Sequence, residues 1–479
     1  MKQAFNPFLP SYEYIPDGEP RLFGERVYLY GSHDRFNGNR FCMNDYVCWS
    51  APKNDLSDWR YEGVIWRRSD DPKSKGKGEG MPAPDCIQGP DGRYYLYYFV
   101  SLPSYIGVAV CNEPSGQFKF HGYVQYPDGQ LLGYKKGDTC QFDPGVYVEG
   151  SDVYLYTGLC PAKHHFHLTL RPKLKINKTG ATVALLEPDM ITIKQPPKTI
   201  VPGIRNCKGT EFEKHPFFEA SSMRKIHDKY YFIYSSYLGH ELCYAVSNTP
   251  NGNFRFGGTL VSIGDIGLRN HTCPKNAANF TGNTHGSILQ LDDKFFVFYH
   301  RQTNRSQFSR QACAEKLYLD KHGHFSQAEI TSCGLNDGPL AGRGTYEARI
   351  ACNLMSARGN RFYLLFRKIH LFEPYFTQTG KDRNENPDQY IANIRNGCVI
   401  GFKYFEFKKA KEINVEIQGS CRGNLIISDE EKTVAQISVS PSKAYTSYNA
   451  SLNISDGVHP LYFKYKGKGY FNFKTFSLN

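Results

Sequence analysis

Short runs of aromatic and branched aliphatic residues recur along the first two thirds of the chain, and each follows a turn. Five of these runs share one form and read RVYLYGS, RYYLYYF, DVYLYTG, KYYFIYS and KFFVFYH. They begin at residues 26, 93, 152, 229 and 294. Helical periodicity is weak before residue 320, and Tyr and Phe favour strands. The pattern therefore predicts an all-β protein.

The five runs behave as repeats, because their starts lie 67, 59, 77 and 65 residues apart. A second motif supports the period: AVCNEPSGQF (109–118) and AVSNTPNGNF (245–254) match at six of ten positions. Long repeats of short strands are typical of propellers. We therefore expect a five-bladed β-propeller over residues 1–332. The alternative, a β-sandwich of ordinary hairpins, leaves the repeat unexplained.

Beyond a Gly-rich stretch near 333–345, which we interpret as a linker, the strand pattern resumes with shorter strands. Alternating residues predict strands at 398–407, 412–419, 423–429, 435–440, 459–467 and 470–478. This number of strands in about 135 residues favours a β-sandwich of jelly-roll type over residues 345–479.

One polar residue precedes each aromatic run, at offsets of 9, 8, 9, 10 and 9 positions. These residues are Asp17, Asp85, Asp143, Glu219 and His285. If the repeats pack around a common axis, the five side chains converge on it. Four of them are carboxylic acids, and converging carboxyl groups are the usual means of hydrolysing glycosidic bonds.

Hydrolysis with inversion needs one carboxyl group that protonates the leaving oxygen and a second that deprotonates a water. We predict Glu219 as the general acid, since the apolar sequence HPFFEASSM would keep it protonated. Asp17, in YIPDGEP, is the predicted general base. Asp85, in MPAPDCI, is predicted to raise the pKa of Glu219.

Other carboxylates compete for these roles. Asp34, at a strand end, and Glu19, on the same face of an extended strand as Asp17, are alternative bases. Asp143, in QFDPGVY, reads as a turn former, and we assign it no catalytic role.

Two basic side chains have open interpretations. His285 is either a hydrogen-bonded core residue or the ligand of a metal ion, reached directly or through water. Arg310, which follows the fifth aromatic run, either anchors sugar hydroxyls or pairs with a carboxylate.

Charge, cysteine content and hydropathy narrow the remaining classes. The formal charge is +12, but the lysines are spread thinly, so the sequence predicts no nucleic-acid partner. No stretch approaches a membrane span, and the N-terminus has no apolar signal core. The 14 cysteines include no C-x-x-C pair. We expect a reduced, cytoplasmic protein, or a secreted one if a leader has been removed.

Four blocks of the first part resemble glycoside hydrolase family 43. They are NPFLPSYEYIPDGEPRLFGERVYLYGSHD (6–34), APDCIQGPDGRYYLYY (83–98), FFEASSMRKIHDKYYFIYSS (217–236) and THGSILQLDDKFFVFYH (284–300). The resemblance implies an inverting mechanism with Asp17 as base, Asp85 as pKa modulator and Glu219 as acid. It also implies a calcium or sodium ion near His285 and a sugar contact for Arg310.

The C-terminal part is similar to a family 6 type carbohydrate-binding module, on the segments QYIANIRNGCVIGFKYFEF and GVHPLYFKYKGKGYFNFKTFSL. It would either bind sugar or serve only as a packing partner. Together the resemblances imply an exo-acting enzyme that removes terminal α-L-arabinofuranose or β-D-xylose from oligosaccharides or polysaccharides. The alternatives are a non-catalytic carbohydrate-binding protein on the same scaffold and a retaining enzyme for another sugar, such as fructose polymers.

Overall fold

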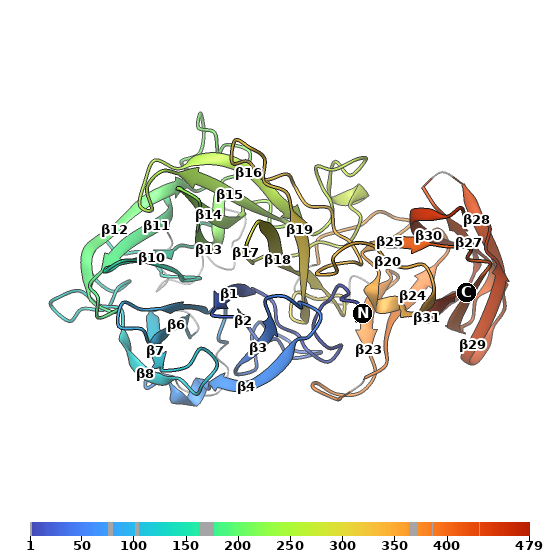
Figure 1. The fold of residues 1–479 in the computed structure, drawn as a ribbon, viewed down its shortest axis with the longest axis horizontal. Helices are drawn as coiled ribbons and strands as arrows, with labels where there is room; N and C mark the ends of the chain where they lie inside the picture. The colour runs from blue at the N-terminus through green and yellow to red at the C-terminus, as the bar shows by residue number, and fades with distance from the viewer. Residues whose placement is uncertain are drawn as a thin grey trace.

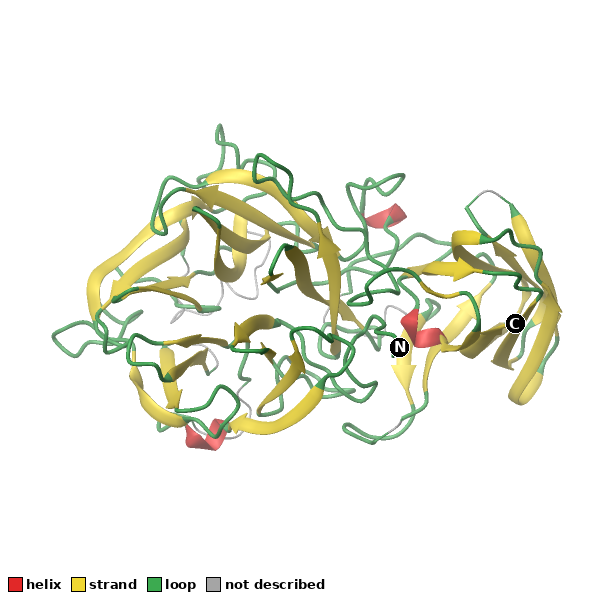
Figure 2. Cartoon of the chain, in the orientation of Figure 1, coloured by secondary structure: helices red, strands yellow, loops and turns green. Residues whose placement is uncertain are grey.

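The computed structural model describes residues 2–74, 80–100, 105–161, 177–363, 371–385, 387–430 and 432–479. Strands supply almost all regular structure in these ranges (Figure 2). The helical elements described there are three single 3-10 turns, at Arg68–Asp70, Pro274–Asn276 and Ala348–Ile350. The all-β prediction is therefore confirmed. Over the same ranges, no helix has the length and apolar character needed to cross a membrane.

Residues 2–332, called here the N-terminal part, form five small antiparallel sheets in chain order (Figure 1). Their strands are β1 (Glu19–Phe23), β2 (Arg26–Tyr30), β3 (Tyr46–Pro52) and β4 (Arg60–Trp66); β5 (Asp85–Gln88), β6 (Tyr94–Phe99), β7 (Ile106–Cys111) and β8 (Lys119–Tyr123); β9 (Gly145–Glu149), β10 (Asp152–Thr157), β11 (Gly180–Leu186) and β12 (Ile193–Pro202); β13 (Phe217–Ile226), β14 (Lys229–Ser236), β15 (Glu241–Ser247) and β16 (Arg255–Ser262); and β17 (Ile288–Leu291), β18 (Lys294–Gln302) and β19 (Arg310–Leu317). The second strand of every sheet is one of the five aromatic runs.

The first strands of neighbouring sheets lie side by side, so that β1 contacts β5 and β17, while β9 contacts β5 and β13. A parallel bridge between Gly18 and Gly286 joins the first sheet to the fifth. The fifth sheet differs from the others because its described part has three strands. After β19 the chain instead forms a short bridge between Leu319 and Phe325, and Phe325 packs among the aromatic rings beside the fourth sheet.

The described residues from 333 to 479, called here the C-terminal part, contain two further six-stranded sheets. One is built from β20 (Leu340–Ala341), β25 (Val399–Phe407), β30 (Gly457–Lys468), β27 (Arg422–Ser428) and β28 (Thr433–Val439), with β22 (Asn353–Met355) beside β25. The other is built from β23 (Tyr375–Gln378), β24 (Gln389–Arg395), β31 (Tyr470–Leu478), β26 (Glu412–Gly419) and β29 (Ser442–Ser451), with β21 (Gly344–Glu347) beside β31. All six strands predicted beyond residue 398 are present, within about two residues at each end.

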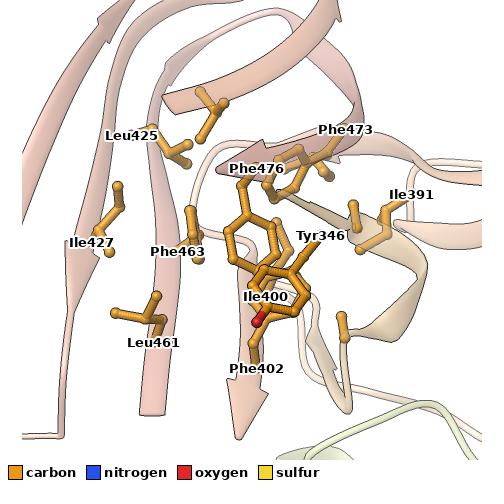
Figure 3. Close-up of a cluster of buried hydrophobic side chains, with 14 of the residues drawn as sticks. Tyr346, Ile391, Ile400, Phe402, Leu425, Ile427, Leu461, Phe463, Phe473 and Phe476 are labelled. Atoms are coloured by element: carbon orange, nitrogen blue, oxygen red, sulfur yellow. The ribbon is translucent and has the colours of Figure 1, made fainter. Parts of the chain in front are cut away.

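The two sheets share one hydrophobic core (Figure 3). Phe402 and Phe463 from one sheet meet Phe476 from the other, with ring centroids 4.6 and 5.6 Å apart. Phe280 of the N-terminal part belongs to the same core and stacks on Tyr363 at 4.9 Å. The two parts of the chain are therefore packed together, and the core of the second includes a residue of the first.

A buried ion cluster also joins the two parts. Lys403 of β25 is 1% exposed, and its Nζ atom lies 3.1 Å from Asp265 Oδ2 and 3.0 Å from Glu329 Oε1. Both carboxylates belong to the N-terminal part. Removing one member of a buried ionic group leaves its partners charged and unpaired. The resulting loss of stability is larger than the net stabilisation that the intact group provides.

We expect Lys403→Met to lower the free energy of unfolding by about 3–5 kcal/mol. Lys408→Met is the matched control, because Lys408 forms an exposed pair with Glu406 at 3.1 Å, and such pairs contribute less than about 1 kcal/mol. Denaturant titration of both variants measures the difference. Equal stability of the two variants would contradict a supporting role for the cluster.

Candidate active site

The strand register shows which residues of the five repeats are equivalent. Opposite the fifth residue of each aromatic run lie Glu19, Asp85, Gly145, Ser222 and Ser287, which we call the lower layer. Two residues earlier in the chain lie Asp17, Ala83, Asp143, Ala220 and His285, which we call the upper layer. Members of the upper layer are brought together by direct contacts, since the Ala220 N–H donates to Asp143 and His285 lies 3.5 Å from Asp143. The inner edges of the five sheets therefore present two layers of side chains.

The upper layer has an unusual backbone. The φ angles of Asp17, Ala83, Asp143 and Ala220 are 58°, 42°, 47° and 69°, in the left-handed region. Such conformations cost about 1–3 kcal/mol each and gather at functional sites. Aspartate tolerates this region better than alanine does. The turn character that the sequence suggested for Asp17 and Asp143 is thus real, and it places both side chains in the upper layer.

Glu219 enters this layer through a bulge. The pairing of β13 with β14 shifts register on both sides of Glu219, so β13 contains two additional residues between Phe217 and Ser222. Bulges re-aim side chains, and this one accounts for the offset of ten where Asp17 and Asp143 have nine. The adjoining Ala220 N–H donates to Asp143 Oδ2 at 3.0 Å. Glu219 and Asp143 are thereby held on neighbouring strands of one site.

Asp17 is buried and held as a carboxylate. Its Oδ1 lies 2.9 Å from Arg310 Nη1, and Ser32 Oγ donates to Oδ2 at 2.6 Å. Burial alone would raise the pKa of Asp17, but Arg310, followed by His300 and His285, lowers it below the usual value. Asp17 is therefore ionised at neutral pH.

His300 fixes the backbone beside this carboxylate. The Asp17 N–H donates to His300 Nδ1 at 3.3 Å, and the other ring nitrogen donates to Asn283 O at 2.8 Å. Burial, and then the charge of Arg310, lowers the pKa of His300 to about 3. A neutral imidazole that accepts at Nδ1 and donates at Nε2 fits both contacts. The sequence analysis did not single out this residue.

Glu219 has the opposite electrostatic setting. The residue is half-buried beside Phe217 and Phe218 in the sequence. Desolvation raises the pKa of Glu219 well above its usual value, and the negative charge of Asp143, then that of Asp17, raises it further. The site therefore contains one ionised and one protonated carboxyl group, which is the arrangement that general acid–base catalysis requires.

His285 lies between two carboxylates. Its Nδ1 is 3.5 Å from Asp143 Oδ2, and its Nε2 is 4.0 Å from Glu19 Oε1. Burial alone would lower the pKa of His285, but Asp143, Asp17 and Glu19 raise it to about 9. A protonated imidazole has no lone pair for a metal. This geometry fits an ion pair between the protonated imidazole and Asp143.

Asp85 is placed differently from the sequence expectation. Asp85 belongs to the lower layer, whereas Asp17 belongs to the upper layer. The upper-layer residue of the second repeat is Ala83. Asp85 accepts two hydrogen bonds from Arg21, at 3.0 and 2.5 Å, and one from the Val146 N–H at 2.8 Å. The charges that raise the pKa of Glu219 come first from Asp143. The turn between β5 and β6 is one residue longer than the turn between β1 and β2, so the offset of eight at Asp85 is equivalent to the offset of seven at Glu19.

The two alternative bases have partners of their own. Glu19 pairs with Arg224 at 2.7 Å and accepts from Ser222 Oγ at 3.0 Å. Asp34 lies beside Arg310, which donates to it from Nε at 2.8 Å and from Nη2 at 3.1 Å. Glu19 is thus part of the lower layer, and Asp34 orients the arginine that holds Asp17.

Arg310 is 1% exposed and contacts two carboxylates and the Phe41 ring, whose centroid lies 4.9 Å from the guanidinium. The sequence left two interpretations of Arg310, a sugar contact and a pair with a carboxylate. The contacts in the structure are pairs with carboxylates. Because Asp34 and Asp17 share this arginine, the position of the ionised Asp17 carboxylate depends on both partners.

The profile of the family "Glycosyl hydrolases family 43" matches residues 12–325. A "Xylosidase/arabinosidase" from Thermoclostridium stercorarium is 47% identical over 480 residues, covering 100% of this chain and 99% of that protein.

Two solved structures are similar at 22% identity, a level that shows a shared fold. The GH43_1 enzyme from Xanthomonas citri complexed with xylose has a TM-score of 0.52 and covers 68% of this chain and 93% of its own. A β-xylosidase/α-arabinofuranosidase from a compost microbial metagenome, described as a calcium-free form with xylotriose, has a TM-score of 0.51 and covers 68% and 98%. The N-terminal part has the propeller fold of these enzymes. The chain belongs to glycosyl hydrolase family 43, and the predicted enzyme class, a glycoside hydrolase, is thereby confirmed.

Proposed function

We propose that this protein is an inverting exo-glycosidase that removes terminal α-L-arabinofuranosyl or β-D-xylosyl residues from fragments of plant polysaccharides. The observation that carries the proposal is the pair of carboxyl groups in opposite protonation states, Asp17 ionised and Glu219 protonated. The name of the Thermoclostridium relative supports the choice of sugars. Glu219 would protonate the leaving oxygen, and Asp17 would deprotonate the attacking water.

In this proposal Asp143, rather than Asp85, is the residue that keeps Glu219 protonated. Its carboxylate is the strongest charged influence on the Glu219 pKa, and its hydrogen bond from the Ala220 N–H fixes it beside the acid. Asp85 has a structural role in the lower layer, where it neutralises the buried Arg21.

We expect Asp143→Asn to move the basic limb of the kcat/KM profile to lower pH. The acid must be protonated, so activity falls as pH rises through the Glu219 pKa, and removing a negative neighbour lowers that pKa. The variant would also lower the pKa of His285, and loss of the positive charge on His285 would raise the pKa of Glu219. Asp143 affects the Glu219 pKa more strongly than His285 does, so the net change is still a lower pKa for Glu219. A pH–rate profile measures the shift.

Asp85→Asn is the matched variant for this prediction. It should leave the basic limb in place and lower the free energy of unfolding, because Arg21 would lose its bidentate partner, a change of about 3–5 kcal/mol. A basic limb that moved in Asp85→Asn and stayed in Asp143→Asn would return the modulating role to Asp85.

We further propose that the five sheets of residues 1–332 are the blades of a five-bladed propeller and that residues 345–479 are a β-sandwich of the carbohydrate-binding type. The contacts between neighbouring first strands and the Gly18–Gly286 bridge support ring closure. The shared core of the two C-terminal sheets supports a sandwich. Sugar binding by the second domain stays a prediction, as does a cytoplasmic location.

Calcium near His285 also stays a prediction. It is supported by the similar enzyme from a compost metagenome, whose structure is described as a calcium-free form. An ion that used His285 as a ligand would have to displace its proton. For Arg310 we propose action through Asp17, because its contacts are with carboxylates; the sugar contact stays a prediction.

The test is hydrolysis of nitrophenyl α-L-arabinofuranoside and nitrophenyl β-D-xyloside, with and without a chelator. Release from either compound supports a pentosidase, and the ratio names the preferred sugar. Proton NMR of the first sugar released separates inversion from retention. Activity lost with chelator and restored by calcium would support the ion. If neither compound is cleaved, the proposed substrate class is wrong.

A further inference from the structure

A hairpin of the C-terminal part, formed by β23 and β24 (Figure 1), contacts the chain segment between β2 and β3. It consists of β23, β24 and their connection. Asp382, in that connection, accepts from the Phe36 N–H at 2.6 Å and from Asn44 Nδ2 at 3.1 Å. Both donors belong to residues 33–45, the segment between β2 and β3, which we call the first-sheet loop.

The next residue extends the same contact. Arg383 donates to Glu13 and lies 3.1 Å from His33 Nε2, while His33 Nδ1 is 2.8 Å from Asp45 O. The hairpin thus contacts the first-sheet loop near both ends, at His33 and Asn44. Two oppositely charged side chains of one connection supply these contacts.

The first-sheet loop in turn holds Asp34. Asn44 Nδ2, which donates to Asp382, also donates to Asp34 O at 3.0 Å, and the Cys42 N–H donates to Asp34 Oδ1 at 3.0 Å. Asp34 orients Arg310, which contacts Asp17. A continuous set of hydrogen bonds therefore runs from the hairpin to the catalytic base.

The strands of the hairpin reach the same point from the other side. Tyr14 donates to Gln378 Oε1 at 2.5 Å and accepts from Gln389 Nε2 at 3.1 Å. The Tyr14 carbonyl accepts from the Asp34 N–H at 2.9 Å. Tyr14 lies three residues before Asp17. The backbone N–H and C=O of Asp34 are thus bonded to Tyr14 and Asn44, and each of these two residues is itself bonded to the C-terminal part.

We propose that Asp382 is a positioning residue for the general base, acting through Asn44, Asp34 and Arg310, and that the C-terminal part thereby completes the active site of the N-terminal part. The inference rests on the proposed role of Asp17. Catalysis is sensitive to small displacements of reacting groups, and an error of 1 Å can cost about 100-fold. A hydrogen-bonded set anchored on a second sheet assembly limits such displacement.

The experiment compares Asp382→Ala, Asp382→Asn and Glu385→Ala in the full chain, with nitrophenyl pentosides as substrates. Glu385 is an exposed carboxylate of the same connection and serves as the matched control. We expect Asp382→Ala to lower kcat about 10-fold with KM and Tm nearly unchanged, because the base acts in the transition state and not in substrate binding. Asp382→Asn should recover part of kcat, since its one oxygen can still accept from Asn44 Nδ2, although the Phe36 N–H then loses its acceptor.

Three results would overturn the inference: a kcat for Asp382→Ala equal to wild type, a raised KM with unchanged kcat, and a lowered Tm with full kcat per folded molecule. The second would make the hairpin a substrate contact, and the third a purely structural one. If Asp382→Ala does not fold, the test rests on Asp382→Asn alone. Full activity of Asp382→Asn would then count against a positioning role for Asp382. If wild-type protein cleaves neither substrate, the proposed function fails instead, so the two failures are distinguishable.

Discussion

Glu219→Gln is expected to lower kcat about 100- to 10,000-fold on xylo-oligosaccharides or other substrates with poor leaving groups, because the amide cannot deliver a proton to the departing oxygen. Nitrophenyl glycosides should lose far less, since nitrophenolate departs without protonation. The fall in activity at high pH should also disappear, because that limb reports the raised pKa of Glu219. Steady-state kinetics on both substrate classes over pH measures all three effects.

Glu213→Gln is the control for this variant, since Glu213 is an exposed carboxylate six residues upstream. It should keep wild-type kinetics on both classes of substrate. Near-normal turnover of oligosaccharides by Glu219→Gln would remove Glu219 from the role of acid. An equal loss on both classes would mean that Glu219 serves the attacking water and not the leaving group.

Asp17→Asn is expected to lower kcat by a similar factor, about 100- to 10,000-fold, but on both substrate classes. A good leaving group gives no relief, because the water must still be deprotonated. The substitution keeps the size of the side chain, and Arg310 retains Asp34 as its partner, so the fold should persist. Adding azide, a nucleophile that needs no base, should restore turnover and give a glycosyl azide of inverted configuration.

Asp58→Asn, at an exposed aspartate paired with Lys2, serves as the control and should behave as wild type. If the Asp17 variant cleaves nitrophenyl glycosides well without azide, the base must be another carboxylate. Asp34 and Glu19 are then the candidates, and both would have to act from within existing ion pairs.

Much of the fold could be predicted from the sequence because its periodic signals are local. Each aromatic run became the second strand of a sheet, and alternation located the strands from β25 to β31, except β29. The pattern did not predict β29, whose residues SKAYTSYNAS are polar and largely exposed. Nor did it predict the three-stranded fifth sheet. Both depend on tertiary pairing that has no local hydrophobic signature.

The site was predictable to within one strand register. Asp17, Glu219, Asp143 and His285 do gather at the inner strands. Asp85 shares the repeat but lies in the lower layer, because the turn between β5 and β6 is one residue longer than the corresponding turns, so an offset of eight there is equivalent to an offset of seven elsewhere. The extra residues beside Glu219 lie in a bulge, which leaves Glu219 next to the upper layer. Spacing alone does not tell these two cases apart.

The contacts of the β23–β24 hairpin have a consequence for how such enzymes are recombined. A chimera that joined this N-terminal part to a foreign carbohydrate-binding partner would lose the Asp382 contacts at the first-sheet loop and the Lys403 cluster at the same time. The stretch near 333–345 is thus a poor crossover point, although composition marks it as a linker. Exchange of C-terminal parts is expected to preserve catalysis only among donors that bring their own matching hairpin.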